Sequence, residues 1–336
     1  MCSVSLTSIR TVSPKSIRER VVVAVVTGAG GFIGRHLVAT LALREPVLGI
    51  DRRAVPAPPG ATALTADLLD ADPAVRAALA QARVVYHLAG SPDVRDPRPD
   101  AAQHRYRDNV LTTAAVLAAV PPDTPLLVTS SSSVYGGSRQ VRSALARSVR
   151  AQPSAETDPL RPRGGYAQSK FLVERLCAGR AEAGGLVTVL RPFTVAGEGQ
   201  RAGMALARWI EAARRGEPLT LLGSPHRSRD ITDVRQVVHV LIDLADRRTT
   251  GVLNIGTGVG HTLQELAEAV CAAAGVAVRT ELAPAHPAEV THTLADTRAL
   301  RRAIGWVPRT DLADLIARQI AAVPAEPQPE SVSAAP

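Results

Sequence analysis

The tyrosine and the lysine of the segment YAQSK, Tyr166 and Lys170, have a spacing that suits acid–base chemistry. Residues four positions apart share one face of a helix. A phenol with an ordinary pKa of about 10 is a poor base at neutral pH, but a nearby ammonium group stabilises the phenolate and makes it usable. The pattern is weak alone, so its meaning depends on what the fold brings beside it.

A row of hydroxyl groups is the second feature that could do chemistry. Ser130 to Ser133 follow the apolar run PLLV and Thr129. Small polar residues at a strand end can form a turn, in which serine competes for local backbone hydrogen bonds. They can also form the mouth of an active site, if other segments bring reactive groups to the same place. Both interpretations stay open at this point.

Three glycines, Gly28, Gly31 and Gly34, form a GxxGxxG pattern that suits phosphate binding. They stand between the apolar run RVVVAVVT and the helical pattern GRHLVATLAL. Glycines allow a tight turn and a close backbone approach, so a pyrophosphate can sit at the helix N-terminus. Because a strand precedes and a helix follows, we interpret the segment as a dinucleotide site.

An acidic residue, Asp51, ends the next expected strand, PVLGIDRR, where a carboxylate could hold a ribose diol. That carboxylate would repel a 2′-phosphate, which favours NAD as the cofactor. Arg52 and Arg53 follow at once and could instead bind that phosphate, so NADP stays open. Asp67 and Leu68, in TADLLD, stand where a loop could cover the adenine. Asp67 could also be a helix N-cap, and the two roles are compatible.

The composition is that of a soluble globular protein: 336 residues, 46% hydrophobic and 21% charged. No apolar run approaches the roughly 18 residues of a membrane helix, and the N-terminus lacks the apolar core of a signal peptide. The three cysteines lie far apart and show no metal-ligand spacing. We therefore expect a cytoplasmic protein with no membrane partner and no metal.

The net charge of +8 is carried almost entirely by arginine, since Lys15 and Lys170 are the only lysines. Basic proteins attract nucleic acid through phosphate contacts. Here the arginines are spread along the chain and aromatic residues make up only 3%. A small phosphorylated ligand explains the charge more simply than nucleic acid does.

In the first half of the chain, short runs of β-branched residues alternate with helical patterns. These elements must position the residues described above. This order is typical of βαβ units. We predict an α/β fold, a Rossmann doubly wound parallel sheet with a smaller, discontinuous C-terminal portion. The predicted parts are a flexible extension (1–20), a nucleotide-binding domain (21–192), a mainly substrate-binding portion with some return to the sheet (193–322), and a disordered tail (323–336). Residues 137–165 are predicted to form a surface loop.

The combination of TGAGGFIG, ADL, HLAG, SSSSVYG, YAQSK, RPF and NIGTG resembles the extended short-chain dehydrogenase/reductases of the NAD-dependent epimerase/dehydratase type. The resemblance runs from about residue 21 to 320. It implies tightly held NAD, a nucleotide-sugar substrate, and a homodimer formed through helices beside the tyrosine. It also implies catalytic roles for Ser131, Tyr166 and Lys170. The implied cofactor contacts are Gly28, Gly31, Phe32, Ile33, Gly34, Asp51, Arg52, Asp67, Leu68, Leu88, Ala89, Tyr166 and Lys170.

The two positions after Ser131 bear on the reaction. Dehydratases that resemble this chain carry Asp-Glu there, and related decarboxylases carry Glu just before VYG. This chain has Ser132 and Ser133 instead. Elimination is therefore disfavoured, which leaves reversible oxidation at C4 of the sugar or reduction of a ketone.

Two arginines narrow the expected substrate. Arg95, in GSPDVR, and Arg201, in TVAGEGQRAGM, resemble stretches of uronic-acid nucleotide-sugar 4-epimerases. The resemblance implies interconversion of UDP-glucuronic acid and UDP-galacturonic acid through a 4-keto intermediate. The implied substrate residues are Arg95, Ser132, Ser133, Thr194, Arg201 and Arg229. Each arginine could also be a solvated loop residue in so arginine-rich a chain.

Two other functions stay open. One is an NADPH-dependent nucleotide-deoxysugar 4-ketoreductase, which would consume its cofactor. The other is a catalytically silent Rossmann protein that senses a dinucleotide or binds nucleic acid. The chain also departs from the family pattern, with Glu198 where the motif VYGP has proline and with His286 to Glu289 in place of an arginine-containing stretch.

Overall fold

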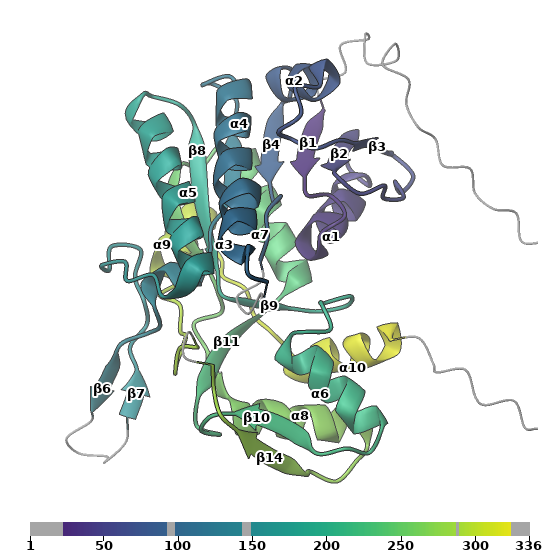
Figure 1. Ribbon diagram of the computed structural model, residues 1–336, viewed down its shortest axis with the longest axis vertical. Coiled ribbons are helices and arrows are strands. Elements are labelled where there is room, and N and C mark those ends of the chain that lie inside the picture. The colour runs from purple at the N-terminus through teal and green to yellow at the C-terminus, as the bar shows by residue number, and fades with distance from the viewer. Residues whose placement is uncertain (1–22, 93–97, 143–148, 287–288, 324–336) are drawn as a thin grey trace, which may run out of the picture.

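Seven parallel strands form the central sheet of the computed structural model, which describes residues 23–92, 98–142, 149–286 and 289–323 (Figure 1). The order is β12-β8-β5-β4-β1-β2-β3, and every neighbouring pair is parallel. The strands are β1 (Ala24–Thr27), β2 (Val47–Asp51), β3 (Ala61–Thr65), β4 (Val84–His87), β5 (Leu126–Thr129), β8 (Val187–Pro192) and β12 (Gly251–Ile255). The predicted Rossmann sheet is confirmed, and β3 is a strand that the sequence analysis did not anticipate.

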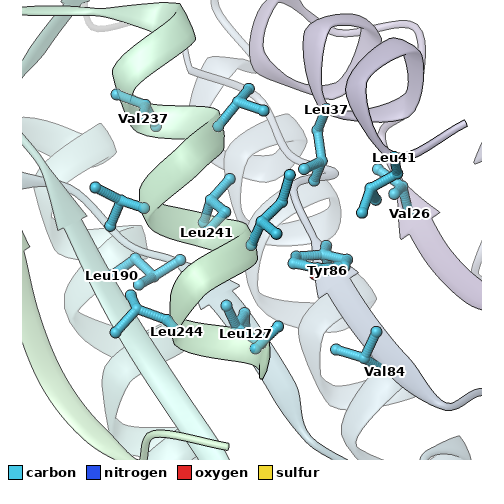
Figure 2. Close-up of a cluster of buried hydrophobic side chains, with 14 of the residues drawn as sticks. Val26, Leu37, Leu41, Val84, Tyr86, Leu127, Leu190, Val237, Leu241 and Leu244 are labelled. Carbon is cyan, nitrogen blue, oxygen red and sulfur yellow. The ribbon is translucent and has the colours of Figure 1, made fainter. Parts of the chain in front are cut away.

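Helices cover both faces of this sheet, which is why most of its strands are apolar throughout. One face packs against α1 (Phe32–Leu41), α7 (Val234–Asp246) and α9 (Arg298–Ile304). The other packs against α2 (Pro73–Ala80), α4 (Thr112–Ala119) and α5 (Gly164–Glu182). In the first layer Tyr86 lies among Leu37, Leu41, Leu127 and Leu241 (Figure 2). The two layers fix the strand ends relative to one another.

The strand order reverses between β1 and β4, and this point defines where a ligand can bind. In open parallel sheets, ligands occupy the crevice outside the carboxyl ends of the strands at such a switch point. The glycine-rich turn follows β1, and the segment Leu88–Ala89–Gly90 follows β4. The Leu88 amide donates to the Thr27 carbonyl at 3.1 Å, which holds these two segments together.

The C-terminal half builds a second, smaller layer below the sheet in Figure 1. It contains the mixed sheet of β9 (Thr194–Ala196), β11 (Ser228–Asp233) and β13 (Gly260–Thr262), and the pair β10 (Leu219–Leu222) and β14 (Thr280–Ala283). Helices α6 (Ala205–Arg214), α8 (Leu263–Ala274) and α10 (Leu312–Ala322) pack around a separate apolar core. The chain returns from this layer to the large sheet twice, first for α7 and the edge strand β12 and later for α9.

Two segments differ in detail from the sequence analysis. The predicted loop 137–165 contains an antiparallel strand pair, β6 (Gln140–Arg142) with β7 (Val149–Ala151), which projects away from the sheet in Figure 1. The pattern NVLTTAAVLAAV predicts a helix over residues 109–120, and the structure shows a longer continuous run of α3 (Ala101–Arg105), a π-helical turn η2 (Tyr106–Leu111) and α4. The predicted extension 1–20, and the predicted tail apart from Val323, lie outside the described residues.

None of the described helices has the length and apolar character needed to cross a membrane. Cys177 and Cys271 are buried free thiols. Cys177 packs in the core between the large sheet and α2, α4 and α5, and Cys271 packs in the core of the C-terminal layer.

Candidate active site

The glycine-rich turn after β1 has no room for side chains. A Cβ on Gly34 would lie 2.1 Å from the Gly28 carbonyl oxygen, and one on Gly28 would lie 2.6 Å from the Ala89 amide. Gly28 also has a φ of +72°, in the left-handed region that favours glycine. The turn therefore packs backbone against backbone between β1, α1 and the end of β4. Phe32 and Ile33 begin α1 at this point.

Asp51 is buried at the carboxyl end of β2 and organises the same turn. Its Oδ2 accepts a hydrogen bond from the Gly30 amide at 2.9 Å, and its Oδ1 accepts one from the Arg53 amide at 3.0 Å. A Cβ on Gly30 would lie 3.1 Å from that Oδ2 and 2.3 Å from Val55 Cγ1. The sequence analysis did not single out Gly30, although its place in the run GAGG was a usable signal.

The two arginines after Asp51 are both held by carboxylates. Arg52 Nη1 lies 3.1 Å from each oxygen of Asp108, and Arg53 Nε lies 3.4 Å from Asp51 Oδ1. A 2′-phosphate would have to compete with these carboxylates for both guanidinium groups. The arrangement fits NAD better than NADP.

Asp67 is not a helix N-cap, which corrects one alternative from the sequence. Its Oδ1 accepts from the Leu69 amide at 3.0 Å, and its Oδ2 accepts from Arg107 at 2.8 Å. The N-cap of α2 is Asp72, whose side chain accepts from the Ala74 amide at 2.7 Å. Leu68 is partly buried against the α2 side of the core. Asp67 thus shapes a turn beside β3 rather than starting a helix.

Ser131, Tyr166 and Lys170 come together at the carboxyl end of β5. Lys170 is buried on α5, and its Nζ donates to the Thr129 carbonyl at 2.8 Å. Burial lowers the pKa of Lys170 to about 8. Burial raises the pKa of the Tyr166 phenol, while a hydrogen bond with Ser131 and the positive charge of Arg201 act in the opposite direction.

The serine row forms a turn, and one of its serines also contacts the tyrosine of the candidate site. Ser131 is the N-cap of a short 3₁₀ helix, η3 (Ser132–Tyr135), and its Oγ accepts from the Ser133 amide at 3.1 Å. The same residue faces the phenol of Tyr166. The Ser133 hydroxyl oxygen is buried, without a hydrogen-bond partner among the described residues. A buried hydroxyl without a partner is costly unless a ligand satisfies it.

Asn109 is a site residue that the sequence analysis missed. It is buried in the π-helical turn η2, and its Oδ1 accepts from the Ser91 amide at 2.8 Å. Its Nδ2 donates to the Ser91 carbonyl at 3.1 Å and to Ser169 Oγ at 2.8 Å. A Cβ on Gly90 would lie 2.5 Å from Asn109 Oδ1 and 3.5 Å from Lys170 Nζ. Asn109 therefore fixes the segment after β4 against the helix that carries Lys170.

A buried ion pair lies directly behind the serine row. Glu174, one turn after Lys170 on α5, accepts from Ser130 Oγ at 2.6 Å and from Arg191 Nε and Nη2 at 2.9 and 2.7 Å. Arg191 Nη1 donates to the Tyr135 hydroxyl at 2.8 Å, and that hydroxyl donates to Asn254 Oδ1 at 2.7 Å. These residues join α5, β8, η3 and β12 into one polar network. In the sequence, Glu174 follows the motif YAQSK, Arg191 belongs to RPF and Asn254 belongs to NIGTG. These motifs gave no further indication that the three residues belong to one network.

The predicted substrate residues have different surroundings. Thr194 begins β9, and its register partner is Ile231 in β11. Arg201 donates to the Pro92 carbonyl at 3.4 Å. Arg229 donates to three backbone carbonyls, those of Ser228 at 2.8 Å, Val290 at 2.9 Å and Thr291 at 3.1 Å. The predicted contact of Arg229 with a diphosphate stays a prediction, and Arg95 lies outside the described residues.

Possible metal ligands are scattered in the part of the chain that the structure describes. No group of three or more His, Cys, Asp or Glu side chains there could hold a metal ion. The buried His87 instead pairs with hydroxyl groups, with Nδ1 2.7 Å from Thr27 Oγ1 and Nε2 3.1 Å from Thr113 Oγ1.

The sequence of this chain matches a known protein family over most of the large sheet. The model of the NAD dependent epimerase/dehydratase family matches residues 24–256, well over half of the chain. The chain belongs to this family. Its cofactor is NAD, and the structure fits that cofactor: Gly28 and Gly34 leave no room for a Cβ in the turn that leads into the N-terminus of α1, and the buried Asp51 ends β2.

Several solved structures and known relatives resemble this chain over most of its length. MoeE5, solved in complex with UDP-glucuronic acid and NAD, is 34% identical with a TM-score of 0.77 over 89% of this chain and 98% of its own. The UDP-glucuronic acid 4-epimerase from Bacillus cereus, solved with UDP-glucuronic acid and NAD, is 25% identical with a TM-score of 0.79 and the same coverage. The UDP-glucose 4-epimerase of Azospirillum brasilense is 29% identical over 87% of this chain and 89% of its own.

Proposed function

We propose that this protein is a nucleotide-sugar 4-epimerase that interconverts UDP-glucuronic acid and UDP-galacturonic acid. Its family and its relatives support epimerisation of nucleotide sugars at C4. The choice of a uronic acid rests mainly on one observation. The Arg201 guanidinium donates to the Pro92 carbonyl after β4, and its positive charge lowers the pKa of the Tyr166 phenol, so it lies on the side of the proposed base where it could bind a carboxylate on the sugar.

The proposed roles follow from the contacts at the end of β5. Tyr166 takes the proton of the sugar 4-hydroxyl, and Ser131 holds the same oxygen by a hydrogen bond. The positive charge of Arg201 favours the ionised form of the phenol, and Lys170, held by the Thr129 carbonyl one helical turn away from Tyr166, is proposed to add a second positive charge. NAD, when bound, would supply the hydride acceptor and donor for C4, and the residues of the chain would present the two faces of the sugar to it in turn. The residues of the chain therefore hold the sugar in two orientations and move one proton.

The serines after Ser131 offer a way to protect the intermediate. A 4-keto uronic acid is a β-keto acid and tends to lose CO₂. Ser133 Oγ is a buried hydroxyl that could donate to the substrate carboxylate, with Ser132 beside it on η3. Such bonds would keep the carboxylate away from the orientation that permits its loss. The Ser132→Ala and Ser133→Ala double variant should release more decarboxylated product, and an unchanged product ratio would argue against this role.

The proposed function is tested by incubating the purified protein with UDP-glucuronic acid, without added cofactor, and following the sugar by proton NMR. Formation of UDP-galacturonic acid would support both the reaction and tight retention of NAD. Formation of a pentose nucleotide would identify a decarboxylase instead. If neither UDP-glucuronic acid nor UDP-glucose changes, while added NADPH reduces a 4-keto deoxysugar nucleotide, the protein is a ketoreductase.

We further propose that the protein forms a homodimer through the side-by-side helices α3, η2, α4 and α5. Three large apolar side chains are exposed on this surface: Tyr106 at 50%, Leu111 at 41% and Leu172 at 41%. A hollow between Leu69 and η2 adjoins Tyr106 and Leu111. The variant Tyr106→Glu combined with Leu111→Glu should sediment as a monomer. The control Leu43→Glu, at a position 87% exposed beyond α1, should leave the association unchanged.

A further inference from the structure

The loop Gly197–Arg201, which follows β9, is bound by helices of both layers. On the NAD-binding side, the guanidinium of Arg35 on α1 donates to the Gly199 carbonyl. The neighbouring His36 places Nε2 2.9 Å from the Glu198 carbonyl. On the C-terminal side, Gln319 Nε2 on α10 donates to the Gly197 carbonyl at 3.0 Å. We call this segment the 197–201 loop.

Glu198 supplies the loop's own side-chain anchor. Its carboxylate binds Arg235 in the first turn of α7 and Arg318 of α10, the latter at 2.5 Å. Glu198 and Arg318 are only 17% and 16% exposed, so water screens this pair weakly. Arg318 also pairs with Asp233 and with Asp314. Although partial burial raises the pKa of Glu198, a hydrogen bond from its own backbone amide, the hydrogen bond with Arg318 and the charges of Arg318 and Arg235 hold that pKa below its ordinary value.

The backbone of this loop is free enough to need such an anchor. Gly199 has a φ of +72° and Gly197 a φ of +145°, both in regions that side-chain-bearing residues rarely adopt. Glycine loses more conformational freedom on ordering than any other residue. A five-residue loop with two such glycines holds one shape only if contacts from outside fix it.

The residue at the end of the loop is Arg201. Its Nη2 donates to the Pro92 carbonyl at 3.4 Å, in the segment that follows β4. Its charge reaches the Tyr166 phenol, where it opposes the effect of burial on the phenol pKa. The loop therefore connects the Glu198 ion pairs at one end with the proposed base at the other.

We propose that Glu198 is a positioning residue that fixes Arg201 beside Tyr166 and so sets the affinity for a substrate carboxylate. This proposal rests on the proposed uronic-acid function. It assigns a purpose to the residue that replaces the proline of the family's VYGP stretch. A proline would restrict the loop through its own ring, whereas Glu198 restricts it through α7 and α10.

The decisive experiment is a double-mutant cycle on the NAD-loaded protein. Glu198→Gln should raise the KM for UDP-glucuronic acid about tenfold, since a displaced Arg201 weakens a charged hydrogen bond. It should lower kcat by a smaller factor, since the Tyr166 phenol also loses a charge that favours its ionised form. In the Arg201→Ala background, Glu198→Gln should have no further effect on KM. An equal rise in both backgrounds, or no rise in the wild-type background, would overturn the proposal.

Two further variants, one a control and the other a second test, separate a positioning role of Glu198 from a general effect on stability. Asp314→Asn removes another carboxylate from Arg318 but leaves Glu198 in place, so KM should not change. Arg235→Gln removes the more exposed partner of Glu198 and should raise KM in the same direction as Glu198→Gln. If Glu198→Gln does not fold, Arg235→Gln still tests the proposal.

A readout that needs no turnover separates this proposal from the proposed function. The Gln200 amide donates to the Gly197 carbonyl at 3.1 Å, and the Met204 amide donates to the Arg201 carbonyl at 3.0 Å. Glu198→Gln should speed hydrogen exchange at these amides about tenfold. Unchanged exchange would overturn the positioning role. If exchange changes but the wild-type protein neither binds nor converts UDP-glucuronic acid, the proposed function fails, and with it the carboxylate as the reason for positioning.

Discussion

At the scale of single residues, the glycine turn after β1 shows how little tolerance the cofactor site has. A Cβ on Gly34 would be 2.1 Å from a backbone oxygen, whereas one on Gly31 would be 3.0 Å from the same Gly28 carbonyl. The first contact forces the backbone to move, and the second needs only a small shift. The two positions therefore form a graded pair for testing the turn.

We expect Gly34→Ala to lose bound NAD by roughly tenfold or more, because relieving the clash with the Gly28 carbonyl oxygen moves the backbone of the turn away from the pyrophosphate. Gly31→Ala should lose less. The measurement is the amount of NAD released per protein on denaturation. Gly179→Ala, inside α5 with nothing within 4 Å of its Cβ, is the control. It should keep NAD and gain about 0.5–1 kcal/mol in free energy of unfolding.

Replacing each of two buried tyrosines with phenylalanine should have different effects on the free energy of unfolding. The Tyr86 hydroxyl is fully buried in the α1–α7 layer (Figure 2), with no hydrogen-bond partner among the described residues. The Tyr135 hydroxyl bonds both Arg191 and Asn254. Tyr86→Phe should leave the free energy of unfolding unchanged or raise it by up to about 1 kcal/mol, while Tyr135→Phe should lower it by about 1–2 kcal/mol. Urea denaturation measures both, and a large loss for Tyr86→Phe would contradict this view.

At the scale of elements, the Glu174–Arg191 pair holds the helix of Tyr166 against the strand next to the serine row. Both side chains are below 10% exposed, at 8% and 4%. A buried ion pair gives little net stability over apolar residues, but breaking it leaves one charge without a partner. The pair therefore matters most for keeping α5, β8 and η3 in one arrangement.

Arg191→Met should lower the free energy of unfolding by about 3–5 kcal/mol, because Glu174 then stays charged and unpaired in the core. Adding Glu174→Leu should recover part of that loss, since both charges are then gone. Epimerase activity of the double variant should remain below that of the wild-type protein even where stability recovers, because Ser130 has lost its acceptor. A double variant with full activity would limit the pair to a role in stability.

At the scale of the whole molecule, the buried His87 couples folding to pH. Burial lowers the pKa of His87 to about 3, with a smaller contribution from the charge of Lys170. In the unfolded chain its pKa is about 6.5, so the unfolded state takes up a proton in a range where the folded state does not. This residue's contribution to stability is complete above about pH 6.5 and declines as pH falls toward 3.

The expected slope from His87 is about 1.4 kcal/mol per pH unit within that window. It is measured as the difference in unfolding free energy between the wild-type protein and His87→Gln from pH 4 to 7. The difference should shrink as pH falls. His239→Gln, at an exposed position on α7, is the control. A pH-independent difference for His87→Gln would mean that the imidazole has the same pKa in the folded and the unfolded state.

Much of the fold and half of the site follow from local features of the sequence. Apolar runs that alternate with helical patterns require a parallel sheet with helices on both faces, because such strands must be covered on both sides. The turn Gly28–Gly34, the acid Asp51 and the helical pair Tyr166 and Lys170 depend on backbone geometry and short spacing. These properties can be deduced without knowing the rest of the chain.

The tertiary structure alone decided which partners the other side chains take. Arg52 pairs with Asp108, and Glu174 pairs with Arg191, across separations of 56 and 17 residues. Arg229 donates to carbonyls 61 and 62 residues away. No local pattern encodes such contacts, since each depends on where the strand ends and loops meet. For the same reason the sequence singled out Arg201, but only the tertiary structure brings its guanidinium to the Pro92 carbonyl, 109 residues away, and Glu198 to the arginines of α7 and α10.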